Sequence, residues 1–143
     1  MVIKCIVVAA FIGICSITDI WNRKIYLSIC GIFLCIGMLL KLFVYTESVG
    51  YTVVSVIPGL LMIAAAFVSK ERVGYGDGVV IFIVGILCGL NMTLGICGFA
   101  FFILSIYSFV MIILKKKKWN DEIPFLPFLM IGNILFMISG GVS

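Results

Sequence analysis

The sequence predicts an all-α membrane protein, folded as a polytopic bundle of six transmembrane helices. Three observations predict it. The chain of 143 residues is 64% hydrophobic, with a mean hydropathy of +1.37. Charged residues make up 11%, under half of the roughly 25% of a soluble domain. Finally, apolar stretches near the membrane-spanning length of about 20 residues recur without barrel-like alternation. Each must be helical, because lipid offers the backbone no other hydrogen-bond partner.

We expect the six helices to follow one another with short connections, within one domain of residues 1–143. The first has Lys4 ahead of an apolar core, as a signal peptide does, but no small-residue cleavage site closes it, so we expect a retained helix. The fourth and fifth are separated only by a predicted turn at 91–95, which makes them a hairpin. The expected spans are 2–18, 25–44, 51–68, 79–94, 95–114 and 125–140.

The basic residues predict the orientation of this bundle. Most follow the first, third and fifth expected helices, so the positive-inside rule places these loops in the cytoplasm and both termini outside. The run of lysines at 115–118 is most simply part of this signal, with contact to anionic lipid as the alternative. Lys4 and Lys41 are left for the outer side. The residues on the expected cytoplasmic side are Arg23, Lys24, Lys70, Arg72 and the lysines 115–118.

Composition argues against several kinds of site. Histidine is absent, which removes the commonest general base and the commonest metal ligand. The six cysteines all lie in apolar stretches, and none forms a C-x-x-C pair. They are therefore interpreted as small apolar fillers and not as zinc ligands or disulfides. We therefore expect no metal and no cofactor. We also expect no nucleic-acid partner, because the net charge of +4 lies in the loops, where it is first a signal of membrane topology.

Two aspartates stand out among the six acidic residues. Asp19 closes the first expected helix, and Asp77 opens the fourth, so both lie at the same side of the membrane. Each abuts an uninterrupted apolar run, where an ionisable residue indicates function. Glu71, Asp121 and Glu122 share that side, but they are expected to be solvated loop charges. The alternatives are a helix N-cap for Asp77 and a helix boundary for Asp19, although the helix dipole disfavours an acid there.

A pair of carboxyl groups within hydrogen-bond reach has a known chemistry. The two groups share one proton, because both cannot ionise cheaply. The ionised member takes a proton from water, while the protonated member donates to a carbonyl oxygen. This hydrolyses a peptide without histidine, metal or a nucleophilic side chain. Gly74 and Gly76, which flank Tyr75 just before Asp77, would let the backbone turn sharply and approach a substrate strand.

These residues resemble a known family. G-Y-G-D at 74–77 resembles the GxGD motif of intramembrane aspartyl proteases. TDIWNRKI at 18–25 is similar to the aspartate, basic residues and isoleucine that follow the first helix of type IV prepilin peptidases. IPFLPFLMIGNIL at 123–135 resembles the proline-containing opening of their last helix. The resemblance covers essentially the whole chain. It implies that Asp19 and Asp77 form the catalytic pair and that Gly74, Tyr75 and Gly76 bind the substrate.

The resemblance also implies a function. Members of this family cleave the leader peptide of type IV pilin-like precursors at the cytoplasmic face of the plasma membrane. In its short length, the chain resembles the family members that serve Flp/Tad-type pili or archaellins. Nothing in the chain corresponds to the cysteine-paired region that larger members link to N-methylation, so a peptidase without methyltransferase activity is expected. Its partners would be a prepilin-like membrane precursor and the lipid bilayer.

The chain departs from the family pattern at three positions. Tyr26 and Leu27 follow Ile25 where the family usually has Pro-Asn, and Val79 stands where a lysine is common. These departures bear on substrate preference and, to a lesser degree, on activity. They motivate one alternative, an inactive relative that binds a prepilin without turnover. A second alternative is a transporter or ion-site subunit, although transport sites usually lie near the membrane midplane.

Overall fold

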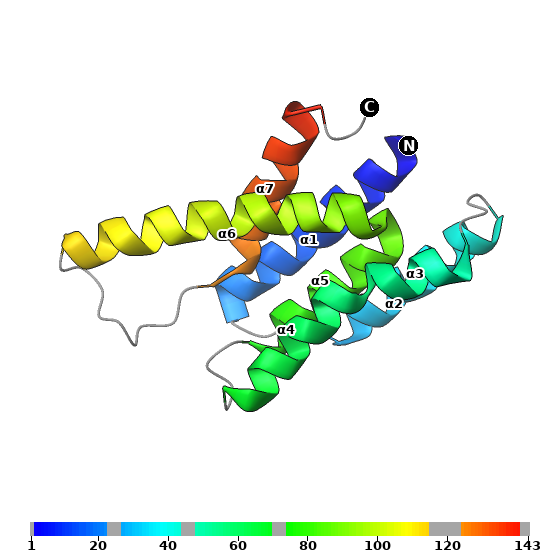
Figure 1. Cartoon of the computed structure of the whole chain (residues 1–143), viewed down its shortest axis with the longest axis horizontal. Coiled ribbons are helices and arrows are strands. Elements are labelled where there is room, and N and C mark those ends of the chain that lie inside the picture. Colours follow the sequence, from blue (N-terminus) through cyan, green and yellow to red (C-terminus); the bar gives the residue numbers. More distant parts are fainter. Residues whose placement is uncertain (1, 23–26, 44–47, 70–73, 115–123, 141–143) are drawn as a thin grey trace.

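The computed structural model describes residues 2–22, 27–43, 48–69, 74–114 and 124–140, and every regular element among them is a helix (Figure 1), which confirms the all-α prediction. The described helices are α1 (Val2–Asn22), α2 (Leu27–Phe43), α3 (Val49–Ser55), α4 (Ile57–Val68), α5 (Tyr75–Cys88), α6 (Leu90–Ile113) and α7 (Leu126–Ile138). Several residues used in the sequence analysis lie outside the described residues: Arg23, Lys24, Ile25, Tyr26, Lys70, Glu71, Arg72, the lysines at 115–118, Asp121 and Glu122.

Three of the described stretches are long and apolar enough to cross a membrane, namely Lys4–Trp21, Gly50–Val68 and Leu90–Ile113. Three shorter apolar helices accompany them, at Ser28–Lys41, Tyr75–Cys88 and Leu126–Ile138. Their order along the chain matches the six predicted spans. The chain is therefore a helical membrane protein.

The third predicted span, 51–68, contains a break that the sequence analysis did not predict. It comprises two helices, α3 and α4, which are divided at Val56. Pro58 lies in the first turn of α4. Proline has no backbone N–H to donate to the carbonyl four residues earlier, and its ring crowds that carbonyl, so a continuous helix is interrupted at this point.

The predicted turn at 91–95 is wrong. The chain turns at Gly89, where α5 ends and α6 begins at once, and residues 91–95 lie inside α6. Gly89 has a φ of 85°, which glycine adopts without the steric penalty of a side chain. Its N–H donates to the Gly85 carbonyl at 3.0 Å, and the buried hydroxyl of Thr93 donates to the Gly89 carbonyl at 2.8 Å. One glycine is therefore enough to end α5 and redirect the chain into α6.

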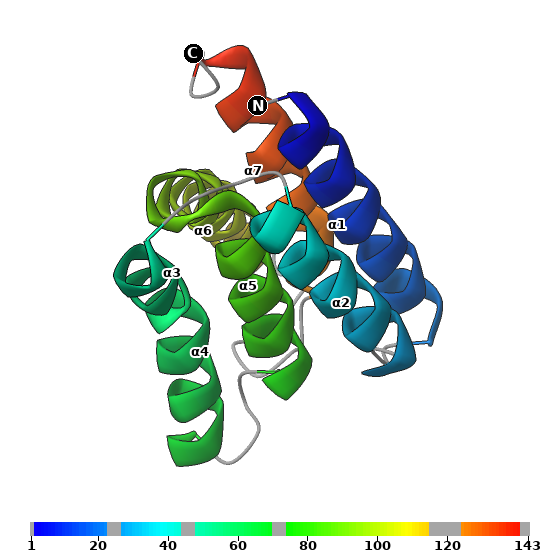
Figure 2. The same cartoon turned by 90° about the vertical axis from the view of Figure 1, so that its right-hand side faces the viewer.

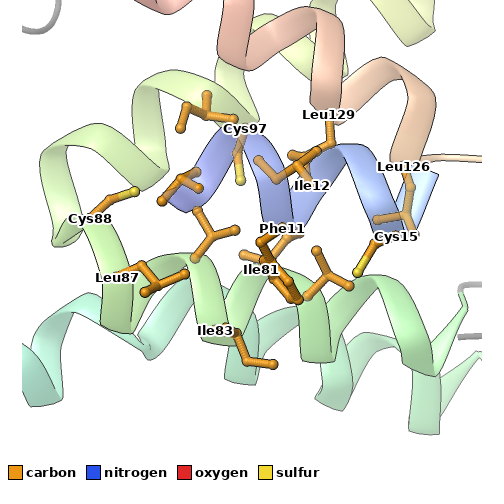
Figure 3. Close-up of a cluster of buried hydrophobic side chains, with 14 of the residues drawn as sticks. Phe11, Ile12, Cys15, Ile81, Ile83, Leu87, Cys88, Cys97, Leu126 and Leu129 are labelled. Carbon is orange, nitrogen blue, oxygen red and sulfur yellow. The ribbon is translucent and has the colours of Figure 1, made fainter. Parts of the chain in front are cut away.

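Helix α5 lies at the centre of the bundle. It packs against α1, α2, α4 and α6, and most of its residues after Asp77 are buried. Phe11 and Ile12 of α1 and Leu126 and Leu129 of α7 meet the side chains of α5 in one apolar core (Figure 3). The start of α1 and the end of α7 lie at one end of this bundle (Figure 2), and the last turn of α1 and the first turn of α5 lie at the other.

Helix α6 crosses the other helices, and its second half extends beyond them (Figure 1). The buried residues of α6 all lie between Met92 and Ala100. Two ring pairs tie the extended half to the start of α7, namely Phe101 with Phe125 and Tyr107 with Phe128, each with centroids 5.1 Å apart. The other apolar side chains of this half are exposed or half-buried, as expected of a surface that faces lipid.

Candidate active site

Asp77 is the third residue of α5, and its surroundings depend on Gly74, the residue that precedes the helix. Gly74 is the residue that caps the helix, so the alternative of Asp77 as N-cap is wrong. The Asp77 N–H donates to the Gly74 carbonyl at 3.1 Å. A Cβ built on Gly74 would lie 3.0 Å from Asp77 Oδ2. The absence of a side chain at Gly74 therefore leaves room for the carboxyl group, which also benefits from the positive end of the helix dipole.

Asp19 lies in the final part of α1, three residues before its last residue Asn22. Asp19 as a whole is half-buried, and its Oδ2 atom is buried. The negative end of the α1 dipole disfavours a carboxylate here. An acid that is retained in such an unfavourable place favours a functional interpretation over a helix boundary.

The fold brings these two aspartates into electrostatic contact. Helices α1 and α5 pack against each other, and Asp77 precedes the membrane-spanning run predicted from residue 79. Burial, and next the negative charge of Asp19, raise the pKa of Asp77 to about 7. Near neutral pH, Asp77 therefore keeps its proton far more readily than an ordinary aspartate does. A pair of carboxyl groups that share one proton is the arrangement needed for acid–base hydrolysis.

The other predicted site residues form the rim beside Asp77. Gly74 is exposed, Gly76 is half-buried, and Tyr75 is 37% exposed. They are accessible to another chain at the end of the bundle where Asp77 lies. Val79, which stands at a usual lysine position of the resembling family, is partly buried and packs against the core.

One further glycine beside the site was not predicted from the sequence. Gly78 directly follows Asp77, is buried, and lies against Ile63 of α4. The sequence shows only that Gly78, like Gly76, flanks Asp77. The contact of Gly78 with Ile63 depends on how α4 and α5 pack in the folded chain.

Comparisons with known proteins identify the family of the chain. No curated protein matches the chain, and no solved structure matches it. The model of the type IV leader peptidase family matches residues 6–115, which is more than half of the chain and includes Asp19, Asp77 and the rim residues. This membrane protein therefore belongs to the type IV leader peptidase family.

Proposed function

We propose that this peptidase is an aspartic endopeptidase that removes the leader peptide of type IV prepilin-like precursors, of the Flp/Tad type or archaellin-like. Asp19 and Asp77 are its catalytic pair. The observation that carries the proposal is their placement. Two aspartates that are distant in sequence lie at the same end of the bundle, on helices α1 and α5 that pack together, close enough for the charge of one to act on the other.

The proposed reaction needs one proton on the pair. Asp19, ionised, takes a proton from a water molecule while the water oxygen attacks the scissile carbonyl carbon. Asp77, protonated, donates its proton to the carbonyl oxygen, and a tetrahedral diol forms. Asp19 then passes its proton to the leaving nitrogen while Asp77 takes a proton from one hydroxyl of the diol, the C–N bond breaks, and a carboxylic acid and an amine leave. One proton remains on the pair, so no metal or other cofactor is required.

The substrate would bind in an extended form along the rim. Gly74 and Gly76 present backbone without side chains, so a peptide strand can approach closely, and Tyr75 offers a partly exposed ring. The apolar helix of the precursor would lie in the lipid beside the bundle. The distribution of basic residues supports an active site at the cytoplasmic face of the plasma membrane. We propose peptidase activity alone, without methyl transfer.

A cleavage assay in detergent tests this proposal. The purified protein is mixed with a prepilin-like precursor, and the products are identified by mass, which also determines the scissile bond. Asp19→Asn and Asp77→Asn are each expected to reduce cleavage by about 10³-fold, the scale of lost acid–base catalysis. The chain contains a third aspartate, and Asp121→Asn is the matched control, with the rate of the native protein expected.

Each outcome of this assay decides between the candidate functions. Undiminished cleavage by Asp77→Asn would overturn the catalytic pair. Binding of precursors without turnover by the native protein would favour the inactive relative. The transporter alternative has less support, because both carboxyl groups lie at the ends of their helices and not near the midplane. A proteoliposome ion flux that depends on Asp19 would support it.

A further inference from the structure

The residue after Asp77 makes an unusually close contact with the neighbouring helix α4. A Cβ built on Gly78 would lie 2.6 Å from Ile63 Cγ1 and 2.9 Å from the backbone nitrogen of Ile63. Non-bonded carbon atoms normally lie about 3.5–4.0 Å apart. The backbone of α4 therefore occupies the space that any side chain at position 78 would need.

This contact belongs to one face of α5. The next two turns of that face touch α3 and α4 in the same way, since Phe82 lies against Gly59 and Gly85 lies against the Ser55 carbonyl. The neighbouring face carries Asp77, followed one turn later by Ile81, which is buried in the core with side chains of α1. Gly78 is thus the point at which α4 supports the first turn of α5, beside Asp77.

We infer that Gly78 and Ile63 are positioning residues that determine where Asp77 lies relative to Asp19. The inference rests on the proposed catalytic role of both aspartates. Adding a methyl group at position 78 requires the first turn of α5 to move away from Ile63, and the backbone of Asp77 moves with it. Misplacing a catalytic group by about 1 Å can reduce the rate by about 10²-fold.

The test is Gly78→Ala, with Gly98→Ala as the matched control. Both substitutions add one methyl group inside a helix, but a Cβ on Gly98 would meet no other described residue within 4 Å. We expect Gly78→Ala to lower kcat by about 10- to 100-fold. KM should also change, because Tyr75 and Gly76 of the substrate-binding rim lie in the same first turn of α5. The alkaline limb of its pH–rate profile should also shift, since the spacing of the carboxyl groups changes. A mere loss of folded protein would lower the rate without shifting that limb.

A second substitution separates positioning from simple damage. Ile63→Ala removes the Cγ1 atom nearest the added methyl group, so Gly78→Ala/Ile63→Ala should recover part of the lost kcat. Recovery should be incomplete, because the backbone nitrogen of Ile63 remains 2.9 Å from the added Cβ. If Gly78→Ala does not fold, the double variant is compared with Ile63→Ala alone. The double variant should then show the lower kcat and the shifted alkaline limb.

The outcomes are distinct for the two proposals. If Asp77→Asn cleaves like the native protein, the proposed function fails, and this inference fails with it. If Asp77→Asn is inactive while Gly78→Ala shows the kcat and pH profile of Gly98→Ala, only the positioning role is overturned. A lowered kcat with a shifted profile, partly restored by Ile63→Ala, supports it.

Discussion

The two sides of α5 are built differently. Towards α4, contact is between backbones, because Gly59 and Gly78 leave no side chain between the helices. Towards α1, contact is through side chains such as Phe11 and Ile81 in the core. Close backbone packing through small residues is a common way to hold membrane helices together, since lipid supplies no hydrophobic drive. Asp77 therefore follows a helix start that is packed closely against α4, while the charge of Asp19 acts on it from α1.

Breaking the backbone contact should have the largest effect on the fold. A side chain at Gly59 would collide with the backbone of Phe82, so Gly59→Val is expected to lower the stability of the bundle by about 3 kcal/mol or more. The measurement is the melting temperature of the detergent-solubilised protein by size-exclusion chromatography.

Gly31→Val is the control for that measurement. It makes the same change inside helix α2, where a Cβ would have no neighbour within 4 Å in the described part of the chain. Equal melting temperatures for the two variants would show that the α4–α5 contact does not hold α5.

The side of α5 that faces α1 can be probed by pH without a mutation. The pKa of Asp77, raised to about 7 by burial and by Asp19, means that Asp77 keeps the required proton below this pH and loses it above. We expect kcat to fall as pH rises through about 7, approaching tenfold per pH unit well above it. The measurement is the initial rate of precursor cleavage from pH 5 to 9. A rate that stays constant to pH 9 would show that Asp77 is not the proton donor.

A smaller effect is expected at the entrance to α5. The Cβ of Gly74→Ala would lie 3.0 Å from Asp77 Oδ2, so the carboxyl group must shift by a few tenths of an ångström. The backbone of Gly74 is extended, with φ −65° and ψ 125°, which alanine adopts without strain. We therefore expect kcat to fall about threefold to tenfold, with unchanged stability, as measured by cleavage rate and melting temperature.

Gly13→Ala is the control for the change at the entrance. A Cβ on Gly13 would find no described atom within 4 Å, so native kcat is expected. If Gly74→Ala also retains the native kcat, crowding of the Asp77 carboxyl group does not limit the reaction.

The sequence alone determined the class of the protein and its two candidate aspartates. Apolar stretches of membrane-spanning length must be helical in lipid, so hydropathy was sufficient to predict the all-α bundle. Asp19 and Asp77 were recognisable because a carboxyl group beside an apolar run is costly wherever it lies. Their motifs also predicted the family that the match over residues 6–115 shows.

Helix boundaries inside lipid were harder to predict. The residues around Gly89 are almost uniformly apolar, so no polar segment marks the turn, and only the left-handed backbone of Gly89 shows where it lies. The break at Val56 was missed for a related reason, since Pro58 follows the start of a new helix without any change in hydropathy.

Only the tertiary structure decided how Asp77 is held. Gly78 and Ile63 are separated by a helix connection, and their contact depends on the path of α4 against α5. A sequence records that a residue is small but not which backbone fills the space beside it. The raised pKa of Asp77 has the same origin, because burial and the distance to Asp19 are properties of packed helices and not of the residues that form them.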